Sequence, residues 1–125
     1  MGLFSFSSGA KKLPWTSIES VDQLHEVLEN SGDKPALLFK HSTRCSISAM
    51  ALNAFERQWS SENERCQLYF VDLIRNRDVS NEIASATGVT HQSPQAILWN
   101  GKEVLYNASH SGIDANAVEK LLENA

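Results

Sequence analysis

The residue best suited to chemistry in this chain is Cys45, within the stretch Lys-His-Ser-Thr-Arg-Cys-Ser-Ile-Ser at residues 40–48. An apolar run at residues 35–39 precedes it and apolar residues at helical spacing follow it, so we expect a strand-to-helix junction with the cysteine at the start of the helix. Unpaired amides and the helix dipole stabilise a thiolate, the nucleophilic form, at that end. The position predicts a reactive thiol; the alternative is a buried cysteine that packs as a small apolar residue.

Several neighbours of Cys45 could take part in thiol chemistry. Arg44 adds positive charge beside a thiolate, and a protonated His41 would do the same. Ser48 lies one helical turn further on, where its hydroxyl could either hydrogen-bond the thiolate or be a tolerated polar group in the first turn. Thr43 is expected to cap the helix.

The second cysteine, Cys66, is too far along the chain to form a Cys-x-x-Cys pair with Cys45. Two cysteines do not make a disulfide framework, and a reducing compartment would keep both as thiols. Cys66 begins a predicted strand, which favours a structural role over that of a distant resolving thiol. The four histidines are scattered and never pair with cysteine at zinc-ligand spacing, so no metal site is expected.

Composition limits the partners. The chain has 125 residues, a net charge of −4 and no basic block, which argues against nucleic acid. No run approaches the roughly 20 apolar residues of a membrane span, and the N-terminus lacks a secretory signal. We therefore expect cytoplasmic residence and no membrane partner. Residues 1–13 lack periodicity and predict a flexible arm, and residues 14–125 predict one domain.

Local patterns predict the elements that position Cys45. Alternating or continuous apolar runs predict strands at residues 14–18, 35–40, 66–73, 96–99 and 103–106. Helices are expected after a capping box at Ser20 and Gln23, after Cys45, before a stop at Gly88, and after a cap at Asp114. The helix after Cys45 is expected to bury a stripe of six residues: Ile47, Met50, Ala51, Ala54, Phe55 and Trp59.

The resulting order, β-α-β-α-β-α-β-β-α, predicts an α/β fold with parallel pairing and a terminal antiparallel hairpin at Asn100-Gly101. A cysteine heads the helix after the central strand, and a proline stands just before the hairpin. Over residues 15–124 this arrangement resembles the thioredoxin fold. The resemblance implies a three-layer α/β/α architecture around a central mixed sheet.

A narrower resemblance rests on residues 39–48 together with His-Gln-Ser-Pro-Gln at residues 91–95. This pair of motifs resembles the YtxJ family of monothiol bacilliredoxins. The family removes bacillithiol, the low-molecular-weight thiol of bacteria that lack glutathione, from protein cysteines. The resemblance implies that Cys45 is the attacking thiol, that Ser48 stands where a dithiol thioredoxin has its resolving cysteine, and that Pro94 matches the cis-proline. The family usually has proline where this chain has Ser46.

The resemblance also implies the partners and the remaining site residues. The partners are bacillithiolated client proteins, with bacillithiol as thiol co-substrate and no other cofactor. The backbone before Pro94 would pair with an extended substrate segment. His91 could reach the same rim, although a lone histidine is more often a surface residue. The residues expected to bind substrate are Arg44, Ser46, His41, His91, Ser93 and Pro94.

Two other function classes compete with thiol exchange. A non-enzymatic thioredoxin-like module would bind a partner through the Pro94 surface, and its interactions would survive loss of the Cys45 thiol. An iron–sulfur carrier like the monothiol glutaredoxins would need a Gly-rich motif after a cysteine and a glutathione-type pocket. The sequence shows no sign of either.

Overall fold

Strand β2 (Ala36–His41) is the centre of the fold, and all six of its residues are buried. In the computed structural model, which describes residues 13–60 and 64–123, β2 pairs in parallel with β3 (Gln67–Asp72) and antiparallel with β4 (Gln95–Trp99). A strand that is covered on both faces needs a nearly continuous apolar run. The residues Ala-Leu-Leu-Phe supply that run.

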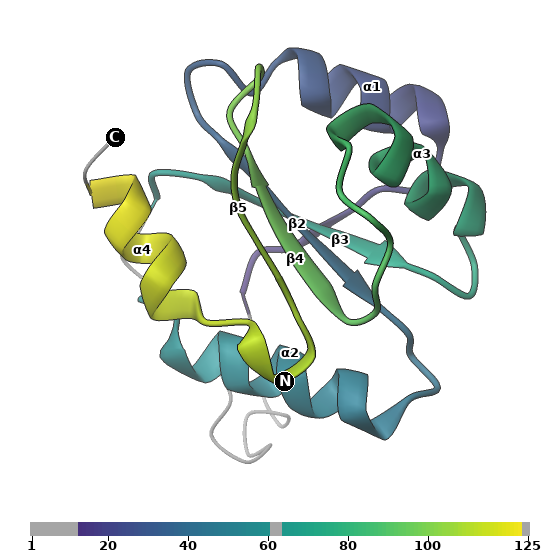
Figure 1. Ribbon diagram of the computed structural model, residues 1–125, viewed down its shortest axis with the longest axis vertical. Coiled ribbons are helices and arrows are strands. Elements are labelled where there is room, and N and C mark those ends of the chain that lie inside the picture. The colour runs from purple at the N-terminus through teal and green to yellow at the C-terminus, as the bar shows by residue number, and fades with distance from the viewer. Residues whose placement is uncertain (1–12, 61–63, 124–125) are drawn as a thin grey trace, which may run out of the picture.

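The sheet has five strands in the order β1-β3-β2-β4-β5 (Figure 1). Strand β1 (Thr16–Ser17) is shorter than the sequence predicted and pairs in parallel with β3. Strand β5 (Val104–Ser109) pairs antiparallel with β4 as the predicted hairpin. The predicted α/β class, the order of elements and the mixed sheet are all confirmed.

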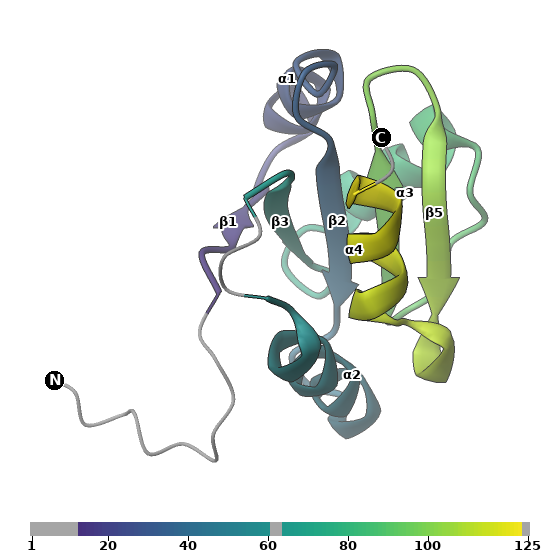
Figure 2. The same ribbon diagram turned by 90° about the vertical axis from the view of Figure 1, so that its left-hand side faces the viewer.

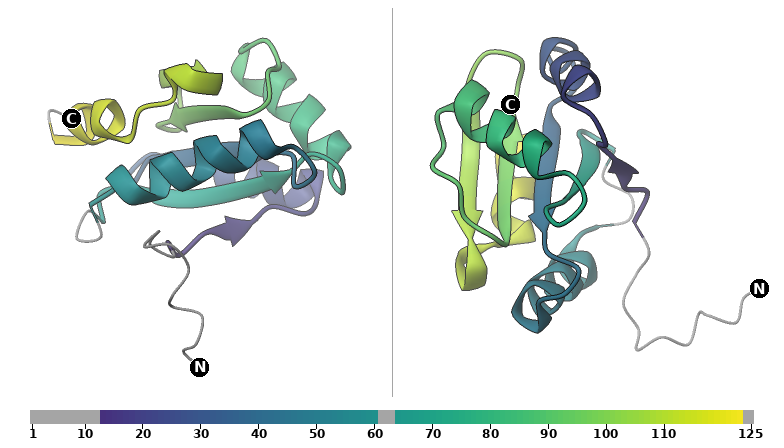
Figure 3. Two further views of the ribbon diagram at one scale, coloured as in Figure 1. Left: turned by 90° about the horizontal axis from the view of Figure 1, so that it is seen from below. Right: turned by 90° about the vertical axis from the view of Figure 1, so that its right-hand side faces the viewer.

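The helices lie on both faces of the sheet, which gives three layers. Helices α1 (Val21–Glu29) and α3 (Arg77–Thr87) contact each other on one face. Helices α2 (Ser46–Gln58) and α4 (Ala115–Glu123) contact each other on the opposite face (Figures 2 and 3). A 3₁₀ turn, η2 (His110–Gly112), leads from β5 toward α4.

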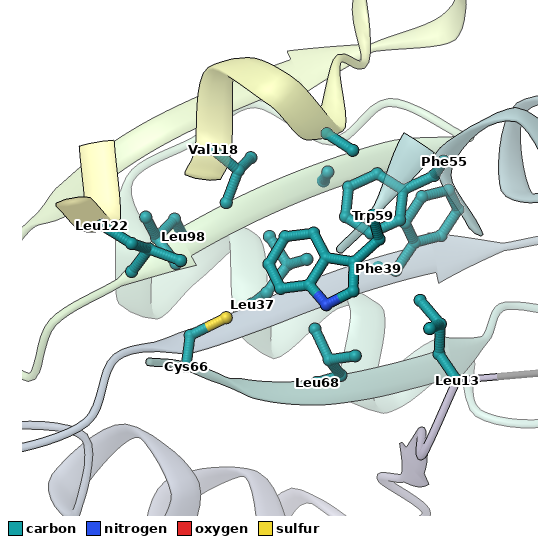
Figure 4. Packing of buried hydrophobic residues seen from close by; sticks show 12 residues of the cluster. Leu13, Leu37, Phe39, Phe55, Trp59, Cys66, Leu68, Leu98, Val118 and Leu122 are labelled. Atoms are coloured by element: carbon teal, nitrogen blue, oxygen red, sulfur yellow. The ribbon is translucent and has the colours of Figure 1, made fainter. Parts of the chain in front are cut away.

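The core consists of two apolar layers, one on each face of the sheet. Side chains alternate along β2, so Leu37 and Phe39 face α2 and α4, whereas Ala36 and Leu38 face α1 and α3. Full burial of one Leu or Phe side chain contributes about 1.5–3 kcal/mol. Figure 4 shows the layer under α2 and α4, whose buried members are Leu13, Leu37, Phe39, Phe55, Trp59, Cys66, Leu68, Ala96, Leu98, Ala115, Val118 and Leu122.

Local signals set several helix ends as predicted. The Ser20 hydroxyl accepts the Gln23 backbone N–H at 3.1 Å. The Gln23 side chain reaches back and accepts the N–H of Glu19, one residue earlier than an ideal capping box. Asp114 accepts the N–H of Asn116 at 2.9 Å at the start of α4. Gly88 ends α3 with a left-handed φ of 78°.

The predicted apolar stripe of α2 is wrong at its first turn. Ile47 and Met50 are 61% and 68% exposed, whereas Ser48 is fully buried in the same turn. Successive helical residues are rotated by about 100°, so the buried line through Ser48, Phe55 and Trp59 leaves Ile47 and Met50 on the outer side. The prediction is confirmed for Phe55 and Trp59, whereas in the first turn Ser48 occupies the inward position.

Two predictions fall partly outside the described residues. Of the arm at 1–13, only Leu13 is described, and its side chain is buried. Residues 60–64 are polar, which predicts a turn, and residues 61–63 of it are not described. Across the residues that are described, no helix has the length and apolar character needed to cross a bilayer.

Replacing Gly88 by alanine should lower the free energy of unfolding by about 1–2 kcal/mol, the cost of left-handed backbone for an L residue. The added Cβ meets no atom within 4 Å, so the loss comes from backbone strain and not from a steric clash. Gly112→Ala is the matched control, because its Cβ also meets open space and its φ lies outside the left-handed region. Urea unfolding followed by tryptophan fluorescence measures both variants, and equal losses would contradict this explanation.

Candidate functional site

Cys45 lies in the turn between β2 and α2, as the sequence predicted. Its backbone is extended, with φ −109° and ψ 120°, and its carbonyl accepts the Ala49 N–H at 3.0 Å. Its own N–H donates to the Ser42 carbonyl at 3.1 Å, which closes a tight turn over residues 42–45. Cys45 is therefore the N-cap residue of α2, and its side chain is partly exposed.

The prediction that Thr43 caps α2 is wrong. Cys45 takes the N-cap position two residues later, and no side chain among the described residues caps the helix there. The tight turn after Ser42 shifts the helix start away from Thr43, which is exposed. The backbone N–H groups of the first turn can therefore donate to the Cys45 sulfur or to a bound anion. Arg44, also exposed, precedes the cysteine directly.

Ser48 is tied into the turn that carries Cys45. Its Oγ accepts the Ser42 backbone N–H at 3.1 Å and lies 2.6 Å from Nδ1 of His41. The hydroxyl is fully buried, so these two bonds offset the cost of burying a polar group. Ser48 thus joins the end of β2 to the first turn of α2 and fixes the course of the chain around Cys45.

His41 is a buried neutral group. It is 6% exposed, and its ring centroid lies 5.4 Å from that of Phe70. Burial lowers the pKa of His41, and the charge of Asp72 and a hydrogen bond with Ser48 oppose that shift only in part. At neutral pH the positive charge next to Cys45 therefore comes from Arg44 and not from His41.

Lys40 is a site residue that sequence reasoning missed. It is fully buried, and its Nζ lies 3.1 Å from Nδ1 of His91. Desolvation lowers the pKa of Lys40 to about 8. The Ser80 Oγ lies 3.3 Å from the same nitrogen of His91. The signal in the sequence is that Lys40 directly follows four apolar residues of a central strand. A lysine at such a position is expected to be buried, and a buried cation needs a hydrogen-bond partner.

The loop before β4 meets the same edge of the sheet. Gln95 pairs with Lys40 across the antiparallel ladder, so Pro94 lies level with His41 at the end of β2. The Ser93–Pro94 peptide bond is cis. The Pro94 carbonyl accepts the His110 N–H at 3.0 Å, which ties the loop to the end of β5. The Cys45 turn and the Pro94 loop therefore leave two neighbouring strands at one edge.

The Gln95 side chain stabilises this loop. Gln95 is a second residue of the site that the sequence did not predict. Its side chain is almost fully buried. Its Nε2 donates to the Thr90 carbonyl at 3.0 Å, and its Oε1 accepts the Gln92 N–H at 3.4 Å. One side chain thus hydrogen-bonds two residues of the loop formed by residues 90–95. His91, in the same loop, is exposed.

Cys66 stands apart from the site. It precedes Gln67, which pairs with Ala36 at the opposite end of β2 from Cys45. A strand of this length separates the two thiols by about 20 Å at 3.3 Å per residue, far beyond the reach of a disulfide. Cys66 is 5% exposed and lies in the core (Figure 4), where burial raises its pKa to about 12. The geometry favours the structural role for Cys66.

Comparison with a family model places these features in context. The model described as "Monothiol bacilliredoxin BrxC" matches residues 16–118. The matched segment runs from β1 into α4, so it contains the Cys45 turn, Ser48, Lys40 and the Pro94 loop.

Solved structures show the same fold. One, described as an oxidoreductase with a thioredoxin fold, shares 30% identity over 84% of this chain and 90% of its own, with a TM-score of 0.67. Thioredoxin from Malassezia sympodialis has 20% identity, covers 90% and 91% of the two chains, and gives a TM-score of 0.63. Thioredoxin from Trypanosoma brucei brucei has 13% identity, covers 93% and 94%, and gives 0.66. The predicted thioredoxin-like fold is confirmed.

Three of the four histidines should titrate on opposite sides of the ordinary histidine pKa. Burial lowers the pKa of His41 and of His91, whereas the hydrogen bond that Glu82 accepts from His25 raises the pKa of that exposed histidine. Because folding favours neutral His41, the unfolded chain binds more protons below about pH 6.5, so this group's contribution to stability falls as the pH drops. NMR titration of the imidazole protons measures this order, with His25 as internal control. A midpoint for His41 above that of His25 would contradict it.

Proposed function

The chain belongs to the monothiol bacilliredoxin family, and on that basis we propose that it removes bacillithiol from protein mixed disulfides by thiol–disulfide exchange at Cys45. The observation that carries the proposal is the isolation of this thiol. Cys45 heads a helix that no side chain among the described residues caps, a serine stands one turn on, and Cys66 is buried at the far end of the strands.

The exchange needs two steps. The Cys45 thiolate attacks the bacillithiol sulfur of the mixed disulfide, the S–S bond breaks, and the client cysteine leaves as a thiolate that takes a proton from water. Cys45 is then disulfide-bonded to bacillithiol. A second bacillithiol thiolate attacks that bacillithiol sulfur, which releases the Cys45 thiolate and forms bacillithiol disulfide. Overall, the mixed disulfide and one bacillithiol give the reduced client and bacillithiol disulfide; the client sulfur gains one electron and the sulfur of the second bacillithiol loses one, so the electrons balance.

The surrounding residues suit this chemistry. Arg44 directly precedes Cys45 in the chain, where it would add positive charge near the attacking sulfur, and Ser46 retains a backbone N–H that proline would lack at the first helical position. The backbone at Ser93 would pair with an extended client segment, as an added strand does. Exposed Ile47 and Met50 offer that client apolar contact next to Cys45.

Compartment and partners follow from the same chemistry. Monothiol exchange needs a pool of reduced small thiol, which the cytoplasm maintains. We therefore assign the protein to the cytoplasm, with bacillithiolated proteins as clients and bacillithiol as the resolving thiol. No further cofactor enters the two steps.

Intact-mass spectrometry after exposure to bacillithiol disulfide should show one bacillithiol adduct, on Cys45, that a second portion of bacillithiol removes. Cys45→Ser should abolish the adduct, and Cys66→Ser, the matched control, should leave it unchanged, because the Cys66 thiol is buried. Equal labelling of the two cysteines, or no adduct on Cys45, would refute the proposal.

Ser48→Cys should change the product. A second thiol one helical turn from Cys45 can attack the adduct, as in Cys-x-x-Cys proteins. The variant should therefore release bacillithiol without added thiol and gain an internal disulfide, which the same mass measurement detects as a loss of two hydrogens. Persistence of the adduct in this variant would mean that the position is not that of a resolving thiol.

The alternative, a non-enzymatic binding module, uses the same surface. The observation that favours it is the exposure of Ile47 and Met50 in the first turn and a half of α2, close in the chain to Cys45. A pull-down that compares wild type with Cys45→Ser separates the two functions. Partners held by a disulfide are lost from the variant, whereas partners held by surface contacts remain.

A further inference from the structure

A second polar cluster lies on the other face of β2 from Ser48 and has no part in the exchange steps. Lys40 points toward α3, where Ser80 is buried, and His91 closes the cluster from the loop before β4. Among the described residues no carboxylate forms an ion pair with the Lys40 ammonium, whose hydrogen-bond partner is His91. A buried ammonium group that hydrogen-bonds a histidine limits which ring nitrogen of that histidine can carry the proton.

The constraint follows from donor and acceptor chemistry. An ammonium group has donors and no acceptor, so at 3.1 Å the Nδ1 of His91 must accept from Lys40. The Ser80 hydroxyl, 3.3 Å from the same nitrogen, also approaches it. A nitrogen that accepts carries no proton, and a neutral imidazole then has its proton on Nε2. The other tautomer would direct an N–H against the ammonium.

Electrostatics keep His91 neutral as well. Partial burial lowers its pKa first, and the charges of Lys40 on β2 and Arg77 on α3 lower it further. Ser80, the remaining group on α3 within hydrogen-bond distance, is uncharged. Charges on both β2 and α3 therefore disfavour a second proton on His91.

The side of the His91 imidazole that carries Nε2 is the side that can contact a substrate. Nδ1 faces a fully buried lysine while the His91 residue as a whole is exposed, so Nε2–H lies toward solvent. His91 is three residues before Pro94, in the loop of residues 90–95 that the Gln95 side chain stabilises. Because His91 hydrogen-bonds Lys40, the next-to-last residue of β2, it lies near the end of β2 from which the Cys45 turn departs.

We propose that Lys40 is a positioning residue that fixes His91 as a neutral imidazole with its proton on Nε2, and that this N–H donates a hydrogen bond to an acceptor oxygen of the disulfide substrate. The substrate contact rests on the proposed function, whereas the tautomer does not. The acceptor is either a carboxylate of the small thiol or a backbone carbonyl of the client.

Nitrogen-15 NMR of the imidazoles tests the tautomer without any substrate. Wild type should show Nδ1 unprotonated and Nε2 protonated at His91 across neutral pH. Lys40→Met should give a mixture of tautomers and a higher titration midpoint for His91, while His25 keeps its own midpoint. Protonated Nδ1 in the wild type would overturn the proposal. Should Lys40→Met fail to fold, the wild-type spectrum alone decides the point.

Two substitutions of exposed His91 test the substrate contact. The glutamine amide of His91→Gln reaches the position of Nε2–H, whereas His91→Asn reaches only that of Nδ1. His91→Asn should slow exchange about three- to tenfold, the value of one hydrogen bond, and His91→Gln should retain most of the rate. Equal rates in the two variants and wild type would refute the contact.

The source of the acceptor is decided by two substrates. Bacillithiol disulfide alone carries the small-thiol oxygens, and a bacillithiolated client adds the backbone carbonyls. A loss in both assays assigns the acceptor to the small thiol, and a loss with the client alone assigns it to the client. If wild type exchanges neither substrate, the proposed function and the substrate contact are both refuted, and the tautomer stands or falls on the NMR result.

Discussion

The site depends on the pairing of β2 with both of its neighbours. The parallel ladder to β3 and the antiparallel ladder to β4 fix where β2 ends. The turn that carries Cys45 leaves that end, and the loop that carries Pro94 enters beside it. Register alone brings together two segments that lie about fifty residues apart in the chain. Loss of the ladder between β2 and β4 would separate the Cys45 turn from the Pro94 loop.

Signals confined to a few residues were sufficient to predict much of the fold. The capping box at Ser20, the stop at Gly88 and the cap at Asp114 each act within one turn of chain, and each was found in the structure. The order of elements followed from these signals and from apolar runs. The resemblance to a family contributed the assignment of Cys45 and of Pro94 to one site.

Features that depend on tertiary partners could not be predicted in this way. Ser48 faces inward because His41 and the Ser42 amide satisfy its hydroxyl, and this choice turns Ile47 and Met50 outward. Lys40 was overlooked because its partner, His91, is distant in sequence. In both cases a polar side chain lies in a buried position, and only the three-dimensional contact explains why the position tolerates it.

The proposed function requires Cys45 to exchange as a single thiol. The most direct measurement is the rate at which bacillithiol reduces a bacillithiolated client protein in the presence of wild type, Cys45→Ser or Cys66→Ser. Cys66→Ser should keep the wild-type rate, because the Cys66 thiol is buried at the far end of β2, whereas Cys45→Ser should show only the uncatalysed rate. A Cys45→Ser protein that still accelerates the reduction would contradict this mechanism.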